Sequence, residues 1–551
     1  MDAYKRRFFY MTLVVCSIFV CTYFFNIEFP VQDEYQTIIH QLAGGHFSDG
    51  PVMDYYFLAY IGYSYIITLL SGFIGFINWV GVIEIGLLML GMFIYLRKVL
   101  KISSETHDNI WFLGGCLLIT MLTFLDGFTV ISYSRPALLL CGISLYTLLF
   151  EESSDAKKWL FCLLFLMGLL LRPESGLGMI VYISVAYVIF RFDILFVLNR
   201  IKWPLLMVGI YMLVVSLLIN TSDNFLFKIE PEVEYKFMQG YVKQLSADAT
   251  PVDAIKYFLA INGFIFDPSV LSAEYLRSIQ TTPDFSQIFS NALGVVGKII
   301  YYWDFYFVST GILMTGVFVS IYCRRFDILG KILLFSAITF LLFVALRINS
   351  GVGHRHIHPF FLMYNLLIFT YVVRQIDLEK LKNPMIWSCS LSVLVFSLFV
   401  YVGNTASWSA ALVNSCKISE QRRTLIEKKY HGELIVGTLD SMKDIFDRRF
   451  SFLNKKDFNN QYMLFEFYNF SMLPPYDRYM KRILNDNHYN IKDAYKYFCV
   501  QHALYFSSEK KVQLVQTYLN LVYKETISFK KEKGRFSDEP YATNLYRISC
   551  N

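Results

Sequence analysis

The sequence predicts an all-α polytopic membrane protein with about 11 transmembrane helices and a separate polar domain after them. Of the 551 residues, 55% are hydrophobic and only 17% are charged, and the mean hydropathy is +0.43. This composition has too few charges for several soluble domains and excludes a disordered or fibrous chain. Apolar stretches recur through residues 1–403, and about 18 or more apolar residues suffice to cross a bilayer core of about 30 Å.

The first predicted span is the apolar run from about residue 8 to residue 25. Lys5, Arg6 and Arg7 precede it, so its N-terminus is expected in the cytoplasm. The run is too long for the apolar part of a signal peptide and lacks a small-residue cleavage site. We therefore expect it to remain as a membrane anchor.

The positions of the basic loops determine the other spans, because cytoplasmic loops are enriched in Lys and Arg. The segments expected in the cytoplasm are 97–101, 151–158, 191–202, 323–331 and 374–382. The spans between them are 79–96, 109–125, 132–150, 159–171, 176–190, 203–219, 304–322, 332–346, 359–373 and 385–403. This topology makes residues 1–403 a transmembrane module with external loops at 26–78 and 220–303.

Two parts of the external face allow more than one interpretation. Residues 54–76 are apolar and aromatic, and we expect interfacial or re-entrant helices there, with a twelfth crossing as the alternative. Residues 404–551 form a mainly helical extracytoplasmic domain in this scheme, with 23 Lys and Arg against 16 Asp and Glu. Its aromatic rings form a core or a glycan-binding platform, and a disulfide among Cys416, Cys499 and Cys550 is left open. Nucleic acid is not an expected partner.

Acidic residues in the first external loop are candidate proton acceptors. Asp33 and Glu34 follow the first span by a few residues, and Asp54 lies later in the same loop. Partial desolvation near a membrane raises the pKa of a carboxyl group and makes it a better general base. The alternative for Asp33 and Glu34 is the stabilisation of a helix N-terminus.

Four arginines map to the outer face, against the usual bias of positive charge toward the cytoplasm. They are Arg135, Arg172, Arg347 and Arg355. Ionisable groups at membrane depth are candidates for functional sites, and a guanidinium matches a phosphate group with two parallel hydrogen bonds.

Neighbouring polar residues could complete such a phosphate site. His354 and His356 flank Arg355 and are expected to hydrogen-bond phosphate; on a strand, together with His358, they could instead share a face and bind a metal. Glu174 either contacts substrate or pairs with Arg172, and Asp126 precedes Arg135 in the same part of the chain.

Three motifs resemble the GT-C superfamily of integral-membrane glycosyltransferases, which take a sugar from a polyprenyl-phosphate carrier on the outer side of a membrane. They are QDEYQTIIHQLAGGHF at 32–47, GLLLRPESGL at 168–177 and GHRHIHPFF at 353–361. The resemblance implies that Asp33 is the general base, with Glu34 its neighbour or substitute, and that Arg355 contacts the donor phosphate. Where many members carry a second acid, this chain has Arg135, and Asp126 lies earlier.

The resemblance implies an inverting glycosyltransferase in a bacterial inner membrane, with its site and C-terminal domain facing the periplasm. Its partners would be a polyprenyl-phosphate-linked sugar donor, a glycan acceptor such as O-antigen, and the lipid bilayer. No cofactor is required in this mechanism, and a divalent metal is optional but not indicated. The donor phosphate would be bound by Arg355, Arg347, Arg172, His354 and His356, and the substrates by Arg135, Asp126, Glu174 and Asp54.

The domain organisation resembles that of the bacterial O-antigen-modifying, serotype-converting glucosyltransferases. Two other functions remain open at this point. A polysaccharide polymerase or O-antigen ligase also uses external arginines on a multispan scaffold. A flippase or transporter for lipid-linked sugars would instead need ionisable residues along a path through the membrane midplane.

Overall fold

A computed structural model describes most of the helical part of the chain and several segments of the C-terminal part. The described residues are 12, 16, 66–67, 69–70, 72–74, 76–106, 124, 133–151, 155–221, 242–246, 248–261, 271–282, 284–301, 303–350, 354–375, 384–437, 439–442, 444–445, 462–464, 487, 494–523, 527–532 and 543–550. The chain divides into two compact units. The first unit comprises residues 1–30, 81–214 and 285–412, and the second comprises 31–80, 215–284 and 413–551.

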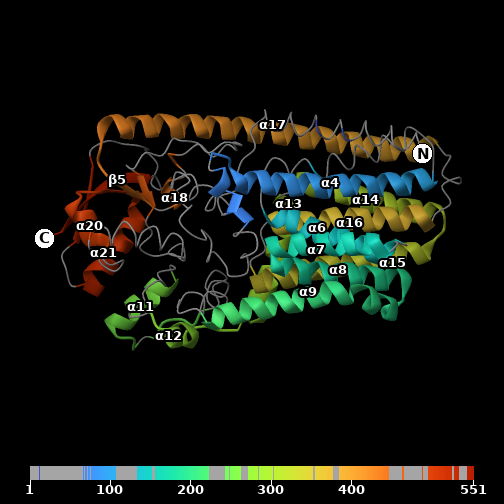
Figure 1. The fold of residues 1–551 in the computed structure, drawn as a ribbon, viewed down its shortest axis with the longest axis horizontal. Coiled ribbons are helices and arrows are strands. Elements are labelled where there is room, and N and C mark those ends of the chain that lie inside the picture. The colour runs from blue at the N-terminus through green and yellow to red at the C-terminus, as the bar shows by residue number, and fades with distance from the viewer. Residues whose placement is uncertain are drawn as a thin grey trace. The chain divides into compact units, whose positions relative to one another are not determined.

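The first unit is built from apolar helices (Figure 1). Their bounds are α4 Trp79–Thr106, α6 Ser134–Phe150, α7 Asp155–Leu171, α8 Pro173–Arg191, α9 Ile194–Thr221, α13 Phe285–Tyr301, α14 Trp303–Tyr322, α15 Phe326–Ser350, α16 His354–Gln375 and α17 Pro384–Lys429. Residues 413–429 of α17 belong to the second unit. Five of the described helices are long and apolar enough to cross a membrane, namely α4, α8, α9, α15 and α16. Three shorter apolar segments fall in α6, α7 and α14.

These findings confirm a predominantly helical membrane protein, while the count of 11 crossings stays a prediction. The predicted span at 109–125 and most of the segment 54–76 lie outside the described residues. One expectation about a loop was wrong. Residues 191–202 are not a loop, because α8 ends at Arg191 and α9 begins at Ile194. Phe192 adopts a left-handed conformation, and the backbone N–H of Phe196 donates to Asp193 Oδ1 over 2.9 Å, so two residues make the turn.

Small polar residues inside these helices bond to the backbone of their own helix. In α6, the hydroxyl of Ser144 donates to the carbonyl of Leu140 over 2.6 Å, and that of Thr147 donates to Ile143 over 2.8 Å. Ser320 and Thr339 make the same kind of bond in α14 and α15. Because these hydroxyls find partners one turn earlier, they can be buried in an apolar bundle without an unpaired donor.

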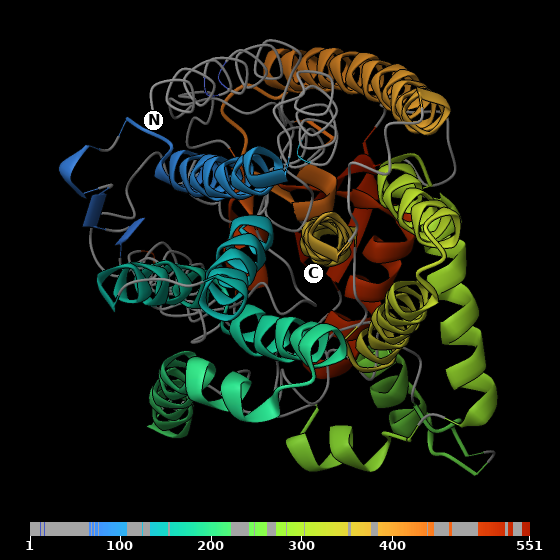
Figure 2. The same ribbon diagram turned by 90° about the vertical axis from the view of Figure 1, so that its right-hand side faces the viewer.

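Helix α16 is the most enclosed of the candidate spans, and it contacts α6, α14 and α15. In the end-on view of Figure 2 it lies among these helices of the first unit. Hydroxyl groups connect it to its neighbours: Tyr146 with Thr370 over 2.8 Å, and Ser336 with Tyr364 over 2.7 Å. A hydrogen bond between side chains of two helices favours one relative rotation, since shifting either helix would break the bond of the tyrosine hydroxyl. Thr370 and Ser336 also donate to carbonyls of their own helices.

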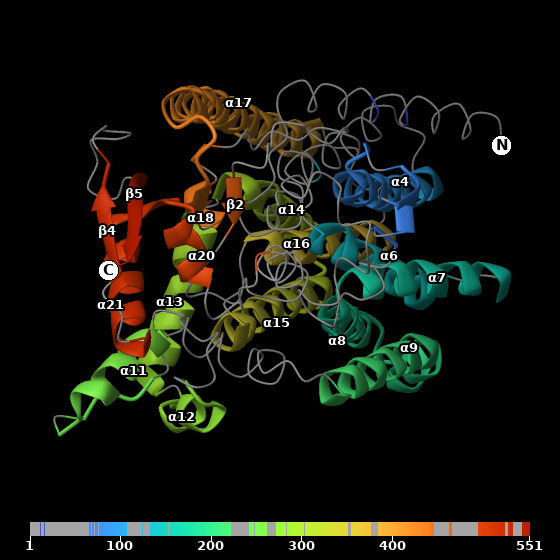
Figure 3. The same ribbon diagram turned by 60° about the vertical axis from the view of Figure 1, so that its left-hand side comes forward.

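The second unit contains a mixed sheet, which the sequence analysis did not predict beside the helices expected for the C-terminal domain. Its strands are β1 Ile435–Gly437, β2 Tyr462–Leu464, β3 Leu504–Ser508, β4 Ile527–Lys531 and β5 Thr543–Cys550, in the spatial order β2-β1-β3-β5-β4. Strand β1 is parallel to β2 and to β3, and β5 is antiparallel to β3 and to β4. Figure 3 shows β4 and β5 beside each other, with α21 (Glu509–Tyr523) next to the sheet.

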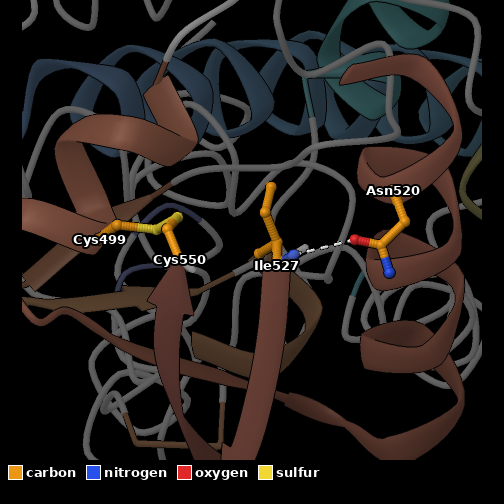
Figure 4. Close-up of a disulfide and its surroundings, with 4 residues drawn as sticks. All are labelled: Cys499, Asn520, Ile527 and Cys550. Carbon is orange, nitrogen blue, oxygen red and sulfur yellow. Dashed lines mark hydrogen bonds between the residues drawn. A yellow bond between two sulfur atoms is a disulfide. The ribbon is translucent and has the colours of Figure 1, made fainter. Parts of the chain in front are cut away.

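A disulfide holds the last strand of this sheet. Cys499 of α20 (Ala494–Val500) is bonded to Cys550 of β5, which settles the pairing that the sequence left open (Figure 4). Asn520 of α21 accepts a hydrogen bond from the backbone N–H of Ile527 over 3.0 Å and so orients the start of β4. Cys416 is buried in α17. The remaining short helices are α11 (Pro251–Ile261), α12 (Ala273–Ser278) and α18 (Leu439–Met442).

Gly168 should be required for the close approach of α6 and α7. A Cβ atom at this position would lie 2.7 Å from both the carbonyl oxygen of Ala137 and the sulfur of Cys141. Gly209 of α9 has nothing within 4 Å of the same point. We expect Gly168→Ala to lower the free energy of unfolding by about 1–3 kcal/mol through overpacking. Gly209→Ala, the matched control, should leave it unchanged or higher. Thermal unfolding in detergent measures both, and equal stabilities would contradict the packing described here.

Candidate functional site

The directions of the helices define two ends of the first unit. Helices α6 and α16 run parallel, because the contacts between them move toward the C-terminus of both helices together. Gly142 lies beside Met363, and further along both helices Arg374 Nη1 donates a 3.3 Å hydrogen bond to the carbonyl of Phe150. Helix α15 is antiparallel to α8, as shown by the 3.3 Å contact of the Tyr182 and Thr339 hydroxyls and the 3.2 Å bond from Lys331 Nζ to the carbonyl of Phe190. Residues 134–135, 172–174, 347 and 354–358 therefore lie at one end.

Cations gather at the other end, which we call the basic end. Lys98 Nζ lies 2.6 Å from Glu151 Oε2, with both side chains almost buried. Arg374 donates to the last carbonyl of α6, Lys331 to a carbonyl near the end of α8, and Arg325 to the last carbonyl of α16. Cations at helix C-termini satisfy unpaired carbonyls and complement the helix dipole, so these residues have a structural explanation.

We call the opposite end the arginine end, and Arg172 is its best-described residue. Arg172 precedes α8 in an extended conformation, and Pro173 occupies the first position of that helix. Its Nη1 donates to Ser134 Oγ over 2.5 Å, its guanidinium lies 5.8 Å from the ring of Tyr133, and its Nε is 3.5 Å from Glu174 Oε2. The Glu174 carboxylate is mostly exposed, so its pairing with Arg172 is weak. The bond to Ser134 instead ties Arg172 to the start of α6.

Arg135 is the next residue of α6 after Ser134, and only 1% of its surface is exposed. Burying a guanidinium in an apolar bundle is costly, so its position must be compensated by nearby polar groups. The contact between Arg172 and Ser134 brings the segments of two of the predicted arginines together.

Two predicted arginines are described only through their helix backbones. The antiparallel contacts of α8 and α15 put Arg347 level with Glu174. The parallel contacts of α6 and α16 put residues 355–358 level with Arg135. The side chains of Arg347, His354, Arg355 and His356 lie outside the described part of the chain. His358, which follows them, is buried. All four arginines therefore belong to helix termini at the same end.

One acid at this end, Glu84 of α4, was not among the predicted site residues. Only 1% of its surface is exposed, although it lies in an apolar membrane-spanning helix. Helices α4 and α6 run parallel, with Gly91 against Leu139 and Lys98 against Glu151. Counted back 14 residues from the second pair, Glu84 is level with Ala137 in the first turn of α6. The signal was present in the sequence, because a carboxylate within a long apolar run is costly and is a candidate for function.

The other predicted site residues are not tested by the structure. Asp33, Glu34, Asp54 and Asp126 lie outside the described residues. One premise is corrected: His354, His356 and His358 belong to the helix α16 and not to a strand, and residues two apart do not share a face of a helix. Within the described residues, no group of three or more His, Cys, Asp and Glu side chains could hold a metal ion.

The fold and the arginine end define a helical membrane protein with charged groups collected at one end of its apolar bundle. Comparison with protein-family models, curated proteins and solved structures finds no match for this chain. Its function is therefore argued from the residues described above.

Cysteines introduced at the two ends should react from opposite sides of the membrane. Lys101 at the basic end and Glu174 at the arginine end have side chains that are 46% and 60% exposed. In intact cells, a membrane-impermeant maleimide should label Glu174→Cys, and Lys101→Cys should react only after the membrane is opened. The parent chain gives the background from the native cysteines. Labelling of both variants from one side would contradict the assignment of the two ends.

Proposed function

We propose that this protein is an inverting glycosyltransferase that moves a sugar from a polyprenyl-phosphate carrier to an acceptor glycan, such as O-antigen, outside the cytoplasm. The observation that carries the proposal is the convergence at one end of Arg172, the buried Arg135 and the helix termini that bear Arg347 and Arg355. It agrees with the donor-phosphate role that the resemblance to the GT-C superfamily implies for this region.

The guanidinium groups at the arginine end favour an anion. Helices α6, α8 and α16 begin there, but α7 and α15 end there, so the dipoles of these helices largely offset one another. The positive potential of this end in the proposal therefore comes from the guanidinium groups. A lipid-linked phosphate fits this position because its charge would meet the arginines while its hydrocarbon tail stays in the bilayer.

The sidedness of the proposal has two independent supports. The basic end carries the loops expected in the cytoplasm, which supports a position of the arginine end on the opposite side of the membrane. The Cys499–Cys550 disulfide is typical of an oxidising compartment, which favours an extracytoplasmic C-terminal domain. For a bacterial inner membrane, both would face the periplasm.

The proposed reaction is a single displacement. Asp33 accepts the proton of an acceptor hydroxyl while that oxygen forms a bond to the anomeric carbon. The bond from the anomeric carbon to the phosphate oxygen breaks, and its electron pair stays on the phosphate. Arg172 and Arg355 stabilise the charge that grows on this leaving group, and Ser134 holds Arg172 in place. Glu84 supplies a buried negative charge at the same level, which either balances Arg135 or acts as a second acid.

Replacement of Asp33 and Arg172 tests the proposal directly. Glycans of cells with and without the gene identify the transferred sugar, and transfer is then measured in membranes. Asp33→Asn should reduce transfer by at least about 100-fold through the loss of the base. Arg172→Lys should reduce it by about 10- to 100-fold, because an ammonium lacks the planar fork of a guanidinium. Arg325→Lys at the basic end is the matched control and should retain transfer. Full activity of Asp33→Asn would refute the catalytic assignment.

Two buried carboxylates at opposite ends should respond differently to neutralisation. Glu84→Gln should lower transfer by about 10-fold or more while the thermal midpoint changes little, since an amide keeps the size of the carboxyl group. Glu151→Gln leaves Lys98 without its charged partner and should cost about 3–5 kcal/mol of stability. Its transfer rate per folded molecule should remain normal. Loss of stability without loss of transfer in Glu84→Gln would assign Glu84 a purely structural role.

A further inference from the structure

The hairpin of α8 and α9 carries two arginines at the basic end. Arg191 is the exposed last residue of α8, and Arg200 lies in the second turn of α9. Both are close enough to Tyr187 to interact with it electrostatically, so they belong to one cluster. Within the described residues, neither guanidinium forms an ion pair or donates a hydrogen bond. They differ in this from the cations of the basic end that donate to helix carbonyls.

The packing of α8 on α9 directs both arginines toward the membrane surface. The rings of Tyr187 and Phe196 stack with their centroids 5.3 Å apart. Arg191 follows Tyr187 by four residues and Arg200 follows Phe196 by four, so each arginine neighbours one of the stacked rings along its helix. The guanidinium of Arg200 lies 4.9 Å from the Phe196 ring, one turn nearer the hairpin bend. Arg200 therefore reaches back toward the basic end, as long cationic side chains do when they extend to a membrane surface.

Lys331 of α15 adds a third cation beside the bend of the hairpin. Its Nζ lies 4.9 Å from the centroid of the Phe192 ring and donates to the carbonyl of Phe190 over 3.2 Å. These two residues flank Arg191 in the chain, so Lys331 and Arg191 are neighbours. An ammonium group has three donors, and this bond uses one of them. We call Arg191, Arg200 and Lys331 the hairpin cations.

Carboxylates near the hairpin cations balance only part of their charge. Asp193 lies in the bend itself, where its Oδ1 accepts the backbone N–H of Phe196. Asp327 of α15 lies near Tyr371, beside the hairpin, but Arg325 holds it through two hydrogen bonds of 2.9 and 3.0 Å. Three cations against the single charge of Asp193 leave an excess of two positive charges among the described residues of this region.

Exposed apolar side chains adjoin the hairpin cations. Phe192, Ile194 and Leu195 are 74%, 60% and 79% exposed. Helices α8, α9 and α15 are each long and apolar enough to cross a membrane, and the bend is where α8 ends and α9 begins. In a spanning arrangement, the cations therefore lie at the level of lipid headgroups, and the exposed side chains of α9 lie next to the acyl chains.

We infer that the hairpin cations bind the phosphate of an anionic phospholipid whose acyl chains lie against the exposed apolar face of α9. Guanidinium and ammonium groups complement a phosphodiester in charge and in hydrogen bonding. A lipid fits better than free phosphate, because only a lipid also covers the apolar side chains beside the cations. Basic pockets between membrane helices bind lipid headgroups in this way. The inference concerns the end opposite the proposed catalytic site and does not rest on sugar transfer.

Lipid binding to the purified full-length protein in neutral detergent tests the inference. The probes are dioleoyl phosphatidylglycerol and dioleoyl phosphatidylcholine, which share their acyl chains, and native mass spectrometry counts the bound lipid. We expect phosphatidylglycerol to bind saturably and more tightly than phosphatidylcholine. Arg191→Gln and Arg200→Gln should each weaken its binding by about fivefold, the effect of one cation near an anionic surface. Because Arg191 is exposed at a helix end, its variant remains informative even where Arg200→Gln does not fold.

The matched control is Lys202→Gln. It removes the same charge from an exposed position of α9, but residue 202 projects to nearly the opposite side of the helix from Arg200, because each residue turns by about 100°. This variant should bind phosphatidylglycerol like the parent chain. The inference is overturned if the two lipids bind equally, if Lys202→Gln weakens binding as much as Arg191→Gln, or if inorganic phosphate displaces phosphatidylglycerol.

Discussion

The helix bundle depends on one constraint: polar groups within an apolar surrounding must be paired inside the protein, because lipid offers no hydrogen bonds. The buried hydroxyl groups of α6, α14 and α15 meet this constraint by bonding to the preceding turn of their own helix. At the basic end, cations satisfy the last carbonyls of the helices. At the arginine end, Arg172 instead contacts the hydroxyl of Ser134 and the carboxylate of Glu174, and this difference distinguishes the two ends.

Ser134 links two helices at the arginine end through its hydrogen bond with Arg172. It is a small residue at the start of α6, yet it accepts a 2.5 Å hydrogen bond from Arg172 at the start of α8. Three groups thus constrain one guanidinium: a hydroxyl, the Tyr133 ring and the Glu174 carboxylate. A guanidinium held in this way loses less conformational freedom when it binds an anion. Ser134 is therefore a positioning residue in the proposed mechanism.

The sequence was sufficient where a local physical rule decides the structure. Apolar length predicted α8 and α14 to within a few residues. It was insufficient where distant segments meet. Strand β1 has only three residues, and its partners in β2 and β3 lie far along the chain, so no local alternation marks it. Glu84 was missed because it stands alone in its apolar run, and its level relative to Arg135 depends on the register of α4 and α6.

The sheet order bears on how the second unit is made during synthesis. Strand β5 is the last of the five along the chain, yet it lies between β3 and β4. Until Thr543–Cys550 emerges, two strands expose unpaired backbone edges, and such edges recruit other chains. Truncations within these eight residues should thus be more harmful than their length suggests, because they remove an interior strand and the cysteine that closes the disulfide.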